Sequence, residues 1–135
     1  MKVIKVNNIL IVEDEAHIRD VFCRLLSAEE YTVFPAENAI VARDLLSSQK
    51  IDLLLLDINM AQVSGEELYA VMNLFHPQIK VIVTSVYPLE EQKRLIPGAS
   101  DYYDKSEGLS ILIEKIRSAL KRTQDKKDFD YSTMN

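Results

Sequence analysis

The chain has 135 residues, the size of one domain, and 47% of them are hydrophobic, so an ordinary buried core can form. Acidic residues outnumber basic ones by 21 to 16, which argues against nucleic acid as a direct partner. The single cysteine, Cys23, excludes an intramolecular disulfide and a cysteine-cluster metal site. The first apolar run, Ile9–Val12, is too short for a signal peptide or a membrane span, so we expect a cytoplasmic protein with no membrane partner.

Five short apolar runs predict strands, and the segments after them have helical spacing. The strands are expected at Ile9–Val12, Tyr31–Phe34, Ile51–Leu56, Lys80–Thr84 and Asp101–Tyr103. The runs Ile51–Leu56 and Val81–Val83 do not alternate polar and apolar residues, which is typical of strands covered on both faces. The helix signals are an Asn38 cap, a capping box at Ser64–Glu67, a stop at His76 before Pro77, Pro88 at a first helical position and a stop at Pro97–Gly98.

The fivefold alternation predicts an α/β fold, a flavodoxin-like (βα)5 doubly wound parallel sheet with helices on both faces. Pro35 suits an edge strand, because proline donates no ladder hydrogen bond. The strand order 2-1-3-4-5 places the second strand at such an edge. We expect residues 8–122 to form the domain, residues 1–7 to lead into its first strand and residues 123–135 to form a tail. We expect no separate output domain.

Polar side chains follow the strands at their carboxyl ends, where doubly wound sheets bind ligands. Glu13 and Asp14 follow the first strand, Asp57 follows the third, Thr84 ends the fourth and Lys105 follows the fifth. Three carboxylates at one place repel one another, and a hard cation such as Mg²⁺ removes that repulsion. A metal, an ammonium and a hydroxyl suit the charge of a phosphoryl group. One carboxylate is then free to act as a nucleophile that forms an acyl phosphate.

With these residues in place, the chain resembles the receiver domain of two-component response regulators, and most of all stand-alone or chemotaxis-type receivers. Four segments carry the resemblance, each at the end of an expected strand: Ile9–Glu15, Leu55–Met60, Val81–Ser85 and Gly98–Lys105. The resemblance implies that Asp57 accepts a phosphoryl group from a partner histidine kinase or histidine phosphotransfer protein. It implies a phosphoacceptor that assists its own phosphorylation and dephosphorylation, and not an enzyme.

The resemblance also assigns roles to the other strand-end residues. Mg²⁺ would be held by Glu13, Asp14, Asp57 and the backbone carbonyl of Asn59. Lys105 would contact the phosphoryl group, Thr84 would turn toward it, and Tyr102 would be an aromatic switch that fills the space Thr84 leaves.

The same resemblance implies two interaction surfaces. The kinase would meet the first helix around His17–Arg24 and the loop after the fifth strand. A downstream protein would bind the face made of Pro88–Ile96, Asp101–Tyr103 and Leu109–Arg122. A weak homodimer through this second face is a less supported alternative.

Three positions depart from the family pattern. Ser106 follows Lys105, where the family usually has proline after a cis peptide bond, so either the loop enforces a cis bond or the bond is trans and the loop shifts. Ala61 stands where proline is common. Val86, two residues beyond Thr84, lacks the polar group that orients the attacking water in fast-hydrolysing receivers.

Three alternative functions stay open. A degenerate receiver would bind its partner without phosphorylation, although the strand-end residues are intact. A phosphatase or phosphotransferase with an aspartate nucleophile commonly uses an Asp-x-Asp motif, and Asp57-Ile58-Asn59 lacks the second acid. A flavin-binding protein of this topology would need a phosphate loop rich in Ser, Thr or Gly after the first strand, and no such loop is present.

Overall fold

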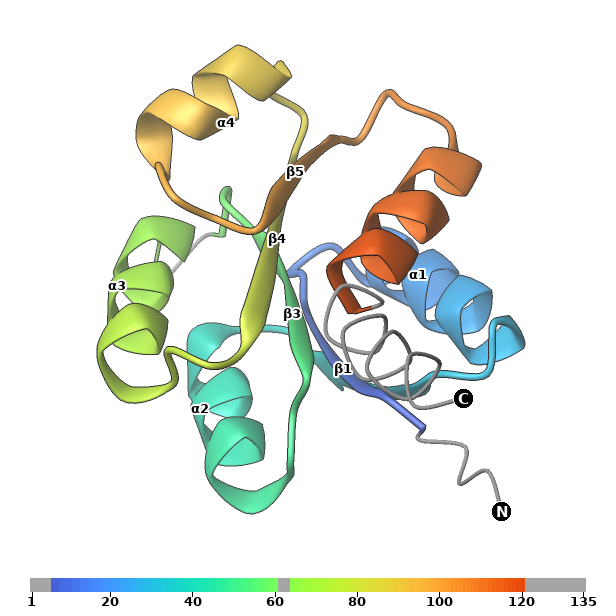
Figure 1. Cartoon of the computed structure of the whole chain (residues 1–135), viewed down its shortest axis with the longest axis vertical. Helices are drawn as coiled ribbons and strands as arrows, with labels where there is room; N and C mark the ends of the chain where they lie inside the picture. The colour runs from blue at the N-terminus through green and yellow to red at the C-terminus, as the bar shows by residue number, and fades with distance from the viewer. Residues whose placement is uncertain (1–5, 61–63, 121–135) are drawn as a thin grey trace, which may run out of the picture.

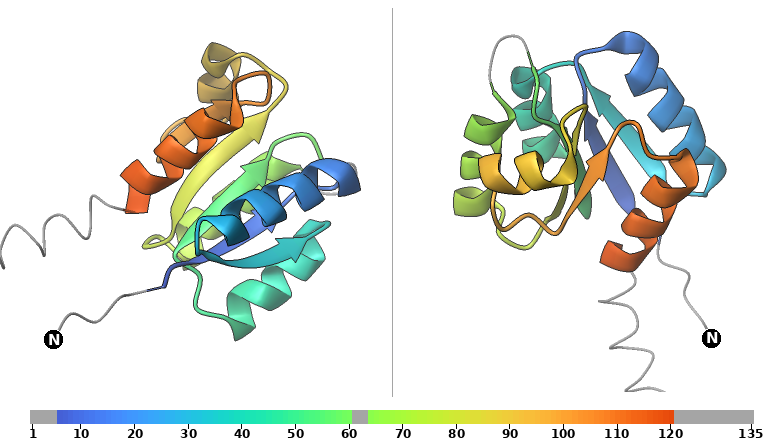
Figure 2. Two further views of the ribbon diagram at one scale, coloured as in Figure 1. Left: turned by 90° about the vertical axis from the view of Figure 1, so that its right-hand side faces the viewer. Right: turned by 90° about the horizontal axis from the view of Figure 1, so that it is seen from above.

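The computed structural model describes residues 6–60 and 64–120, which form a parallel β-sheet between two layers of helices (Figure 1, Figure 2). The strands are β1 (Asn8–Val12), β2 (Thr32–Ala36), β3 (Leu53–Asp57), β4 (Lys80–Ser85) and β5 (Asp101–Asp104). The helices are α1 (Ala16–Ala28), α2 (Ala39–Ser48), α3 (Gly65–Phe75) and α4 (Leu89–Leu95), followed by a helix over residues 109–120. The predicted alternation of strands and helices is confirmed.

The sheet has the order β2-β1-β3-β4-β5 with all neighbouring strands parallel, which confirms the predicted flavodoxin-like topology. β2 lies at an edge and contains Pro35, in register with Ile11 of β1. β1 and β3 are neighbours although α1, β2 and α2 lie between them in the chain. The carboxyl ends of β1 and β3 therefore meet where the strand order reverses, which is the ligand-binding position in sheets of this kind.

Both faces of the sheet are buried, which explains the uninterrupted apolar runs. All five residues of β3 are buried, and successive side chains point to opposite faces. Leu54 belongs to a hydrophobic cluster with residues of α2 and α3, while Leu55 belongs to a second cluster with residues of α1 and 109–120. Figure 2 shows these two helical layers on either side of the sheet.

The predicted helix boundaries follow local hydrogen bonds with one exception. Asn38 Oδ1 accepts a hydrogen bond from the Val41 N–H at 2.9 Å, and Ser64 Oγ accepts one from the Glu67 N–H at 3.2 Å, so both predicted N-caps are confirmed. α3 ends at Phe75 with His76 as its C-cap. The prediction that Pro88 is the first helical residue is wrong by one position. Its extended ψ of 156° makes it the N-cap, and α4 begins at Leu89.

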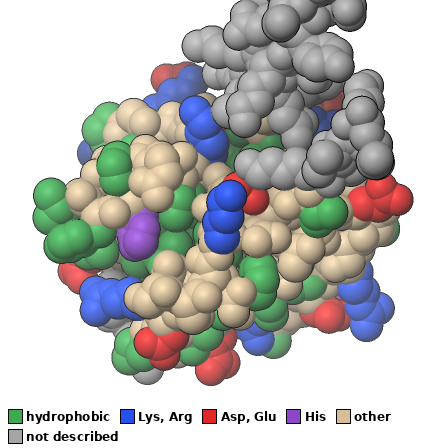
Figure 3. Space-filling model, turned by 60° about the horizontal axis from the view of Figure 1, so that its bottom comes forward, with side chains coloured by type: hydrophobic (Ala, Val, Ile, Leu, Met, Phe, Trp, Pro, Cys, Tyr) green, Lys and Arg blue, Asp and Glu red, His purple; other side chains and the backbone are tan. Residues whose placement is uncertain are grey.

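Some predictions lie outside the described residues. These are the departure at Ala61, the tail over residues 123–135, the last two residues of the expected domain and the first five residues of the N-terminal segment. Within residues 6–60 and 64–120, no helix is long and apolar enough to cross a membrane. On the face drawn in Figure 3, Lys and Arg side chains are scattered among Asp and Glu, and the described residues form no continuous basic patch there.

Candidate functional site

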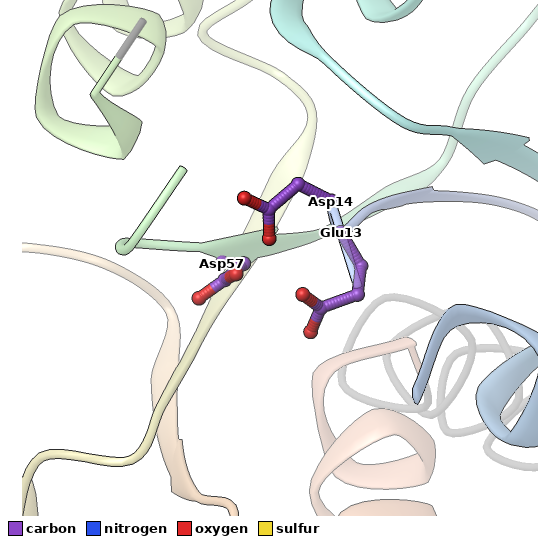
Figure 4. A group of neighbouring side chains, drawn as sticks. All are labelled: Glu13, Asp14 and Asp57. Carbon is purple, nitrogen blue, oxygen red and sulfur yellow. The ribbon is translucent and has the colours of Figure 1, made fainter. Parts of the chain in front are cut away.

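Three carboxylates from two neighbouring strands meet at the carboxyl edge of the sheet (Figure 4). Glu13 and Asp14 directly follow β1, and Asp57 is the last residue of β3. One carboxylate oxygen from each residue lies within 4.8 Å of the other two. Glu13 and Asp57 are only 1% and 2% exposed, whereas Asp14 is exposed to solvent. A cluster of hard oxygen donors that is open on one side fits Mg²⁺, which keeps several water ligands.

Burial and the neighbouring acid change the protonation of Asp57. Burial, the hydrogen bond with Glu13 and the charge of Glu13 raise the pKa of Asp57 from 3.8 to about 7. The ammonium of Lys105 and the N–H of Asn59, which lies 3.1 Å from Asp57 Oδ1, oppose this rise only in part. Glu13 and Asp57 together therefore favour binding of a cation, since a cation stabilises the ionised forms of both carboxyl groups.

Lys105 reaches into the acidic cluster from the loop after β5. Its Nζ lies 2.6 Å from Glu13 Oε1 and 3.4 Å from Asp57 Oδ1, and its side chain is 12% exposed. Burial lowers the pKa of this ammonium, but its contacts with Glu13 and Asp57 have the larger combined effect, so its pKa is raised. The peptide bond between Lys105 and Ser106 is trans, and the lysine still contacts both carboxylates.

Thr84 and Tyr102 lie on the neighbouring strands β4 and β5 but are not in register with each other. Thr84 is buried and in register with Asp57 on one side and Tyr103 on the other. Tyr102 is in register with Val83 and packs in the cluster that includes residues of α2 and α3. The Tyr102 hydroxyl donates to the Ile96 carbonyl and accepts from the Ala99 N–H at 3.2 Å. Thr84 therefore lies beside the acidic cluster, and Tyr102 is anchored to the loop between α4 and β5.

Two further residues with predicted roles, Asn59 and Val86, follow β3 and β4 near the carboxyl edge of the sheet. Asn59 follows Asp57 by two residues, and its Nδ2 lies 3.5 Å from Ser85 Oγ. The role of its carbonyl as a metal ligand stays a prediction. Val86 is 67% exposed and follows Ser85 in the loop before α4.

Arg19 is a contact that the sequence reasoning missed. Its Nη1 donates to the Glu13 carbonyl at 2.8 Å and lies 3.4 Å from the Asp14 carbonyl, so it holds the backbone that carries two of the three carboxylates. On the sequence, Arg19 appears only as a polar residue beside the apolar stripe of α1. Its place in the first turn of the helix that follows an acidic pair is the signal that indicates this role.

Comparison with known proteins connects this chain to a family. The family model that describes the response regulator receiver domain matches residues 9–117 of this chain. A probable transcriptional regulatory protein of Picosynechococcus sp. is 34% identical over 125 residues, which cover 86% of this chain and 50% of that protein. The sporulation initiation phosphotransferase F of Bacillus subtilis is 31% identical over 118 residues, which cover 84% of this chain and 90% of that protein. The chain thus spans about half the length of the first relative and most of the second.

Solved structures of response regulator proteins share the fold of this chain. A CheY-like response regulator receiver domain protein from Methanospirillum hungatei has a TM-score of 0.83 and 27% identity, over 90% of this chain and 99% of that chain. The response regulator TrrA from Thermotoga maritima, in complex with Mg²⁺-BeF, has a TM-score of 0.75 and 29% identity, over 85% of this chain and 100% of that chain. Because the family model matches most of the chain and the relatives share its fold, this protein belongs to the response regulator receiver domain family.

Proposed function

We propose that the chain is a phosphoacceptor in which Asp57 takes a phosphoryl group from a histidine kinase or a histidine phosphotransfer protein. Mg²⁺ would be bound by Glu13, Asp14, Asp57 and the Asn59 carbonyl. The observation that carries the proposal is the convergence of three carboxylates within 4.8 Å, with the Lys105 ammonium in contact with two of them. Receiver domains in general accept phosphoryl groups and do not turn over other substrates, and we extend this to the present chain.

The chemistry assigns one task to each side chain. An Asp57 carboxylate oxygen attacks phosphorus, the P–N bond to the donor imidazole breaks, and the imidazole leaves with the electron pair. Lys105 and the Thr84 hydroxyl stabilise charge on the equatorial phosphoryl oxygens. Bound Mg²⁺ supplies the positive charge that lets carboxylates and phosphoryl oxygens share one site. Glu13 and Asp14 would hold that cation together with one carboxylate oxygen of Asp57, so that the other oxygen of Asp57 stays free to attack phosphorus.

We further propose a receiver unit over residues 8–122 and a cytoplasmic location. The kinase would dock on α1 and the loop after β5. The output face would consist of α4, β5 and the helix over residues 109–120, and a downstream protein would bind there. Tyr102, a buried residue of β5, anchors the loop that joins α4 to β5, which supports the choice of surface. A weak homodimer through the same face is the second candidate.

One experiment separates a phosphoacceptor from a degenerate receiver that binds its partner without phosphorylation. The protein is incubated with acetyl phosphate and Mg²⁺ and its intact mass is recorded. We expect one phosphoryl increment in the wild type, none in Asp57→Asn, and the wild-type increment in the control Asp44→Asn, which changes an exposed aspartate on α2. A full increment in Asp57→Asn rules out the assigned acceptor, and no increment in the wild type favours the degenerate receiver.

A further inference from the structure

A dense set of hydrogen bonds closes the loop after β5, on both sides of Lys105. Asp104 Oδ1 accepts hydrogen bonds from the Ser106 N–H at 2.9 Å and from the Ser106 hydroxyl at 2.8 Å. The Glu107 N–H donates to the Asp104 carbonyl at 2.8 Å, and the Asp104 N–H donates to Glu107 Oε1 at 3.0 Å. Lys105 therefore sits inside a turn whose two flanking residues are bonded to each other.

This turn is also tied to the rest of the fold. The Lys105 N–H donates to the Ser85 carbonyl at 2.8 Å, and the Tyr103 hydroxyl donates to the Glu107 carbonyl at 2.6 Å. Glu107 Oε1 lies 3.6 Å from Lys115 Nζ, on the helix over residues 109–120. The backbone around Lys105 is thus held from β4, β5 and the following helix.

A firm backbone matters here because lysine has a flexible four-carbon stem. The Lys105 ammonium must reach Glu13 and Asp57 through largely buried space, since its side chain is only 12% exposed. The hydrogen bonds from Ser106 hold the pKa of Asp104 below its usual range. Asp104 is thus an ionised acceptor at neutral pH, and bonds to ionised groups are stronger than neutral ones.

We propose that Asp104 is a positioning residue for the phosphoryl-transfer reaction, because its carboxylate closes the turn that presents the Lys105 ammonium to the acidic cluster. Asp104 acts through Lys105 and does not itself contact the reacting atoms. This inference rests on the proposed role of Lys105. It requires that loss of Asp104 slows phosphorylation without weakening Mg²⁺ binding, since Glu13 and Asp14 directly follow β1 and Asp57 ends β3, outside this turn.

Three variants test the role of the Asp104 acceptor oxygen. Asp104→Ala removes the oxygen, and Asp104→Asn keeps one at the same place. Asp44→Ala is the control, because it removes an exposed carboxylate on α2, away from this turn and from the proposed docking surfaces. Phosphorylation by acetyl phosphate is followed by intact mass, Mg²⁺ binding by calorimetry, and folding by circular dichroism.

We expect Asp104→Ala to be phosphorylated about ten- to a hundredfold more slowly than the wild type, because a small misplacement of a charged group has that effect. Asp104→Asn and the control Asp44→Ala should be phosphorylated at rates within about threefold of the wild-type rate. Mg²⁺ affinity should not fall in any of the three. A wild-type rate in Asp104→Ala, or slow phosphorylation in Asp104→Asn equal to that of Asp104→Ala, would overturn the proposal.

A second measurement needs no phosphodonor and separates this inference from the proposed function. Urea unfolding midpoints are compared for Asp104→Ala, Lys105→Met and the double variant. If the turn places the lysine, Lys105→Met should shift the midpoint at most half as far in the Asp104→Ala background as in the wild type. Additive shifts would overturn the positioning role even if Asp57 is phosphorylated. Non-additive shifts in a protein that takes up no phosphoryl group would support the positioning role and reject the proposed function.

Discussion

The Lys105 ammonium lies closer to Glu13 than to Asp57, at 2.6 Å from Glu13 Oε1 and 3.4 Å from Asp57 Oδ1. Glu13 is also one of the three carboxylates that can hold a metal ion. The ammonium and a bound divalent cation would therefore compete for the same buried carboxylate. This competition predicts that Lys105 has opposite effects on metal binding and on phosphoryl transfer.

Lys105→Met should bind Mg²⁺ more tightly, by about tenfold, because a positive charge next to the acidic cluster is removed. The same variant should be phosphorylated more slowly, because no ammonium is left to stabilise the phosphoryl oxygens. Calorimetric titration and intact mass measure the two effects. Lys93→Met, at a lysine on α4 whose side chain is 53% exposed, is the control and should leave both unchanged. Weaker Mg²⁺ binding in Lys105→Met would contradict the competition.

The raised pKa of Asp57 predicts how stability depends on pH without divalent cations. The folded protein keeps a proton on Asp57 up to about pH 7, whereas the unfolded chain releases it near 3.8. The stabilisation that comes from this proton is therefore fully present below pH 3.8 and is lost as the pH rises toward 7. Asp57→Asn cannot ionise. It should match the wild type near pH 4 and exceed it at pH 8 by about 2–4 kcal/mol.

Urea unfolding between pH 4 and 8 in the presence of a chelator measures this difference, and saturating Mg²⁺ should reduce it, because the cation stabilises the ionised carboxylates. A pH-independent difference between Asp57→Asn and the wild type would show that Asp57 is ionised throughout this range.

Asp14 offers the mildest way to disturb the metal site, because it is exposed while Glu13 and Asp57 are buried. Asp14→Ala should weaken Mg²⁺ binding by at least about tenfold. Its free energy of unfolding should stay within about 0.5 kcal/mol of the wild type or increase, as repulsion among the carboxylates is relieved. Fluorescence or NMR titration with Mg²⁺ measures the affinity. Asp20→Ala, an exposed acidic residue on α1, serves as the control, and equal affinity in Asp14→Ala and the wild type would refute the assignment.

Phosphorylation should change the face made of α4, β5 and residues 109–120. The Tyr102 hydroxyl holds the Ile96 carbonyl and the Ala99 N–H, so movement of Thr84 and Tyr102 would reach the loop before β5. Beryllofluoride with Mg²⁺ stands in for the phosphoryl group in an NMR experiment. We expect amide shifts at Ile96 and Ala99 and in the helix over residues 109–120. Shifts confined to the loops at the strand ends would show that this route is wrong.

Tyr102→Phe tests whether the Tyr102 hydroxyl transmits this change to Ile96 and Ala99. The variant keeps the ring and loses both hydrogen bonds, so it should lower the free energy of unfolding by about 1 kcal/mol. It should also reduce the beryllofluoride-induced shifts at Ile96 and Ala99 while leaving those around Asp57 intact. Undiminished shifts at Ile96 and Ala99 would mean that the hydroxyl does not carry the change.

Val86 should make the phosphoaspartate long-lived. Water must attack the acyl phosphate in line, and the exposed Val86 side chain offers it no hydrogen bond. Val86→Gln should speed hydrolysis by about ten- to a hundredfold, the effect of one orienting group worth about 1.4–2.8 kcal/mol. Decay of the purified phosphoprotein measures the rate, and Val86→Ala controls for the loss of bulk. If Val86→Gln loses phosphate no faster than the wild type, the lifetime is set elsewhere.

The fold was predictable from the sequence because each of its signals is local. A strand covered on both faces needs an uninterrupted apolar run, as in β3, and Pro35 is tolerated only where no partner strand needs its N–H. Side-chain caps such as Asn38 and Ser64 act on backbone groups only three residues away. The same locality predicted which polar residues stand at the carboxyl ends of strands, and parallel topology then brought Glu13, Asp14 and Asp57 together.

Tertiary structure alone decided how those residues meet. Three contacts depend on side-chain orientation. Lys105 lies closer to Glu13 than to Asp57, Arg19 donates to the Glu13 carbonyl, and the Tyr102 hydroxyl donates to the Ile96 carbonyl in the loop after α4. The turn that carries Lys105 has a trans bond before Ser106. It depends on hydrogen bonds among Asp104, Ser106 and Glu107 and on the Ser85 carbonyl of β4, which accepts from the Lys105 N–H, and no short sequence pattern encodes these bonds. A sequence specifies which groups arrive at an edge of the sheet. Their pairing is settled only when elements distant along the chain pack together and exclude water, because burial then makes the choice of partner for each charge matter.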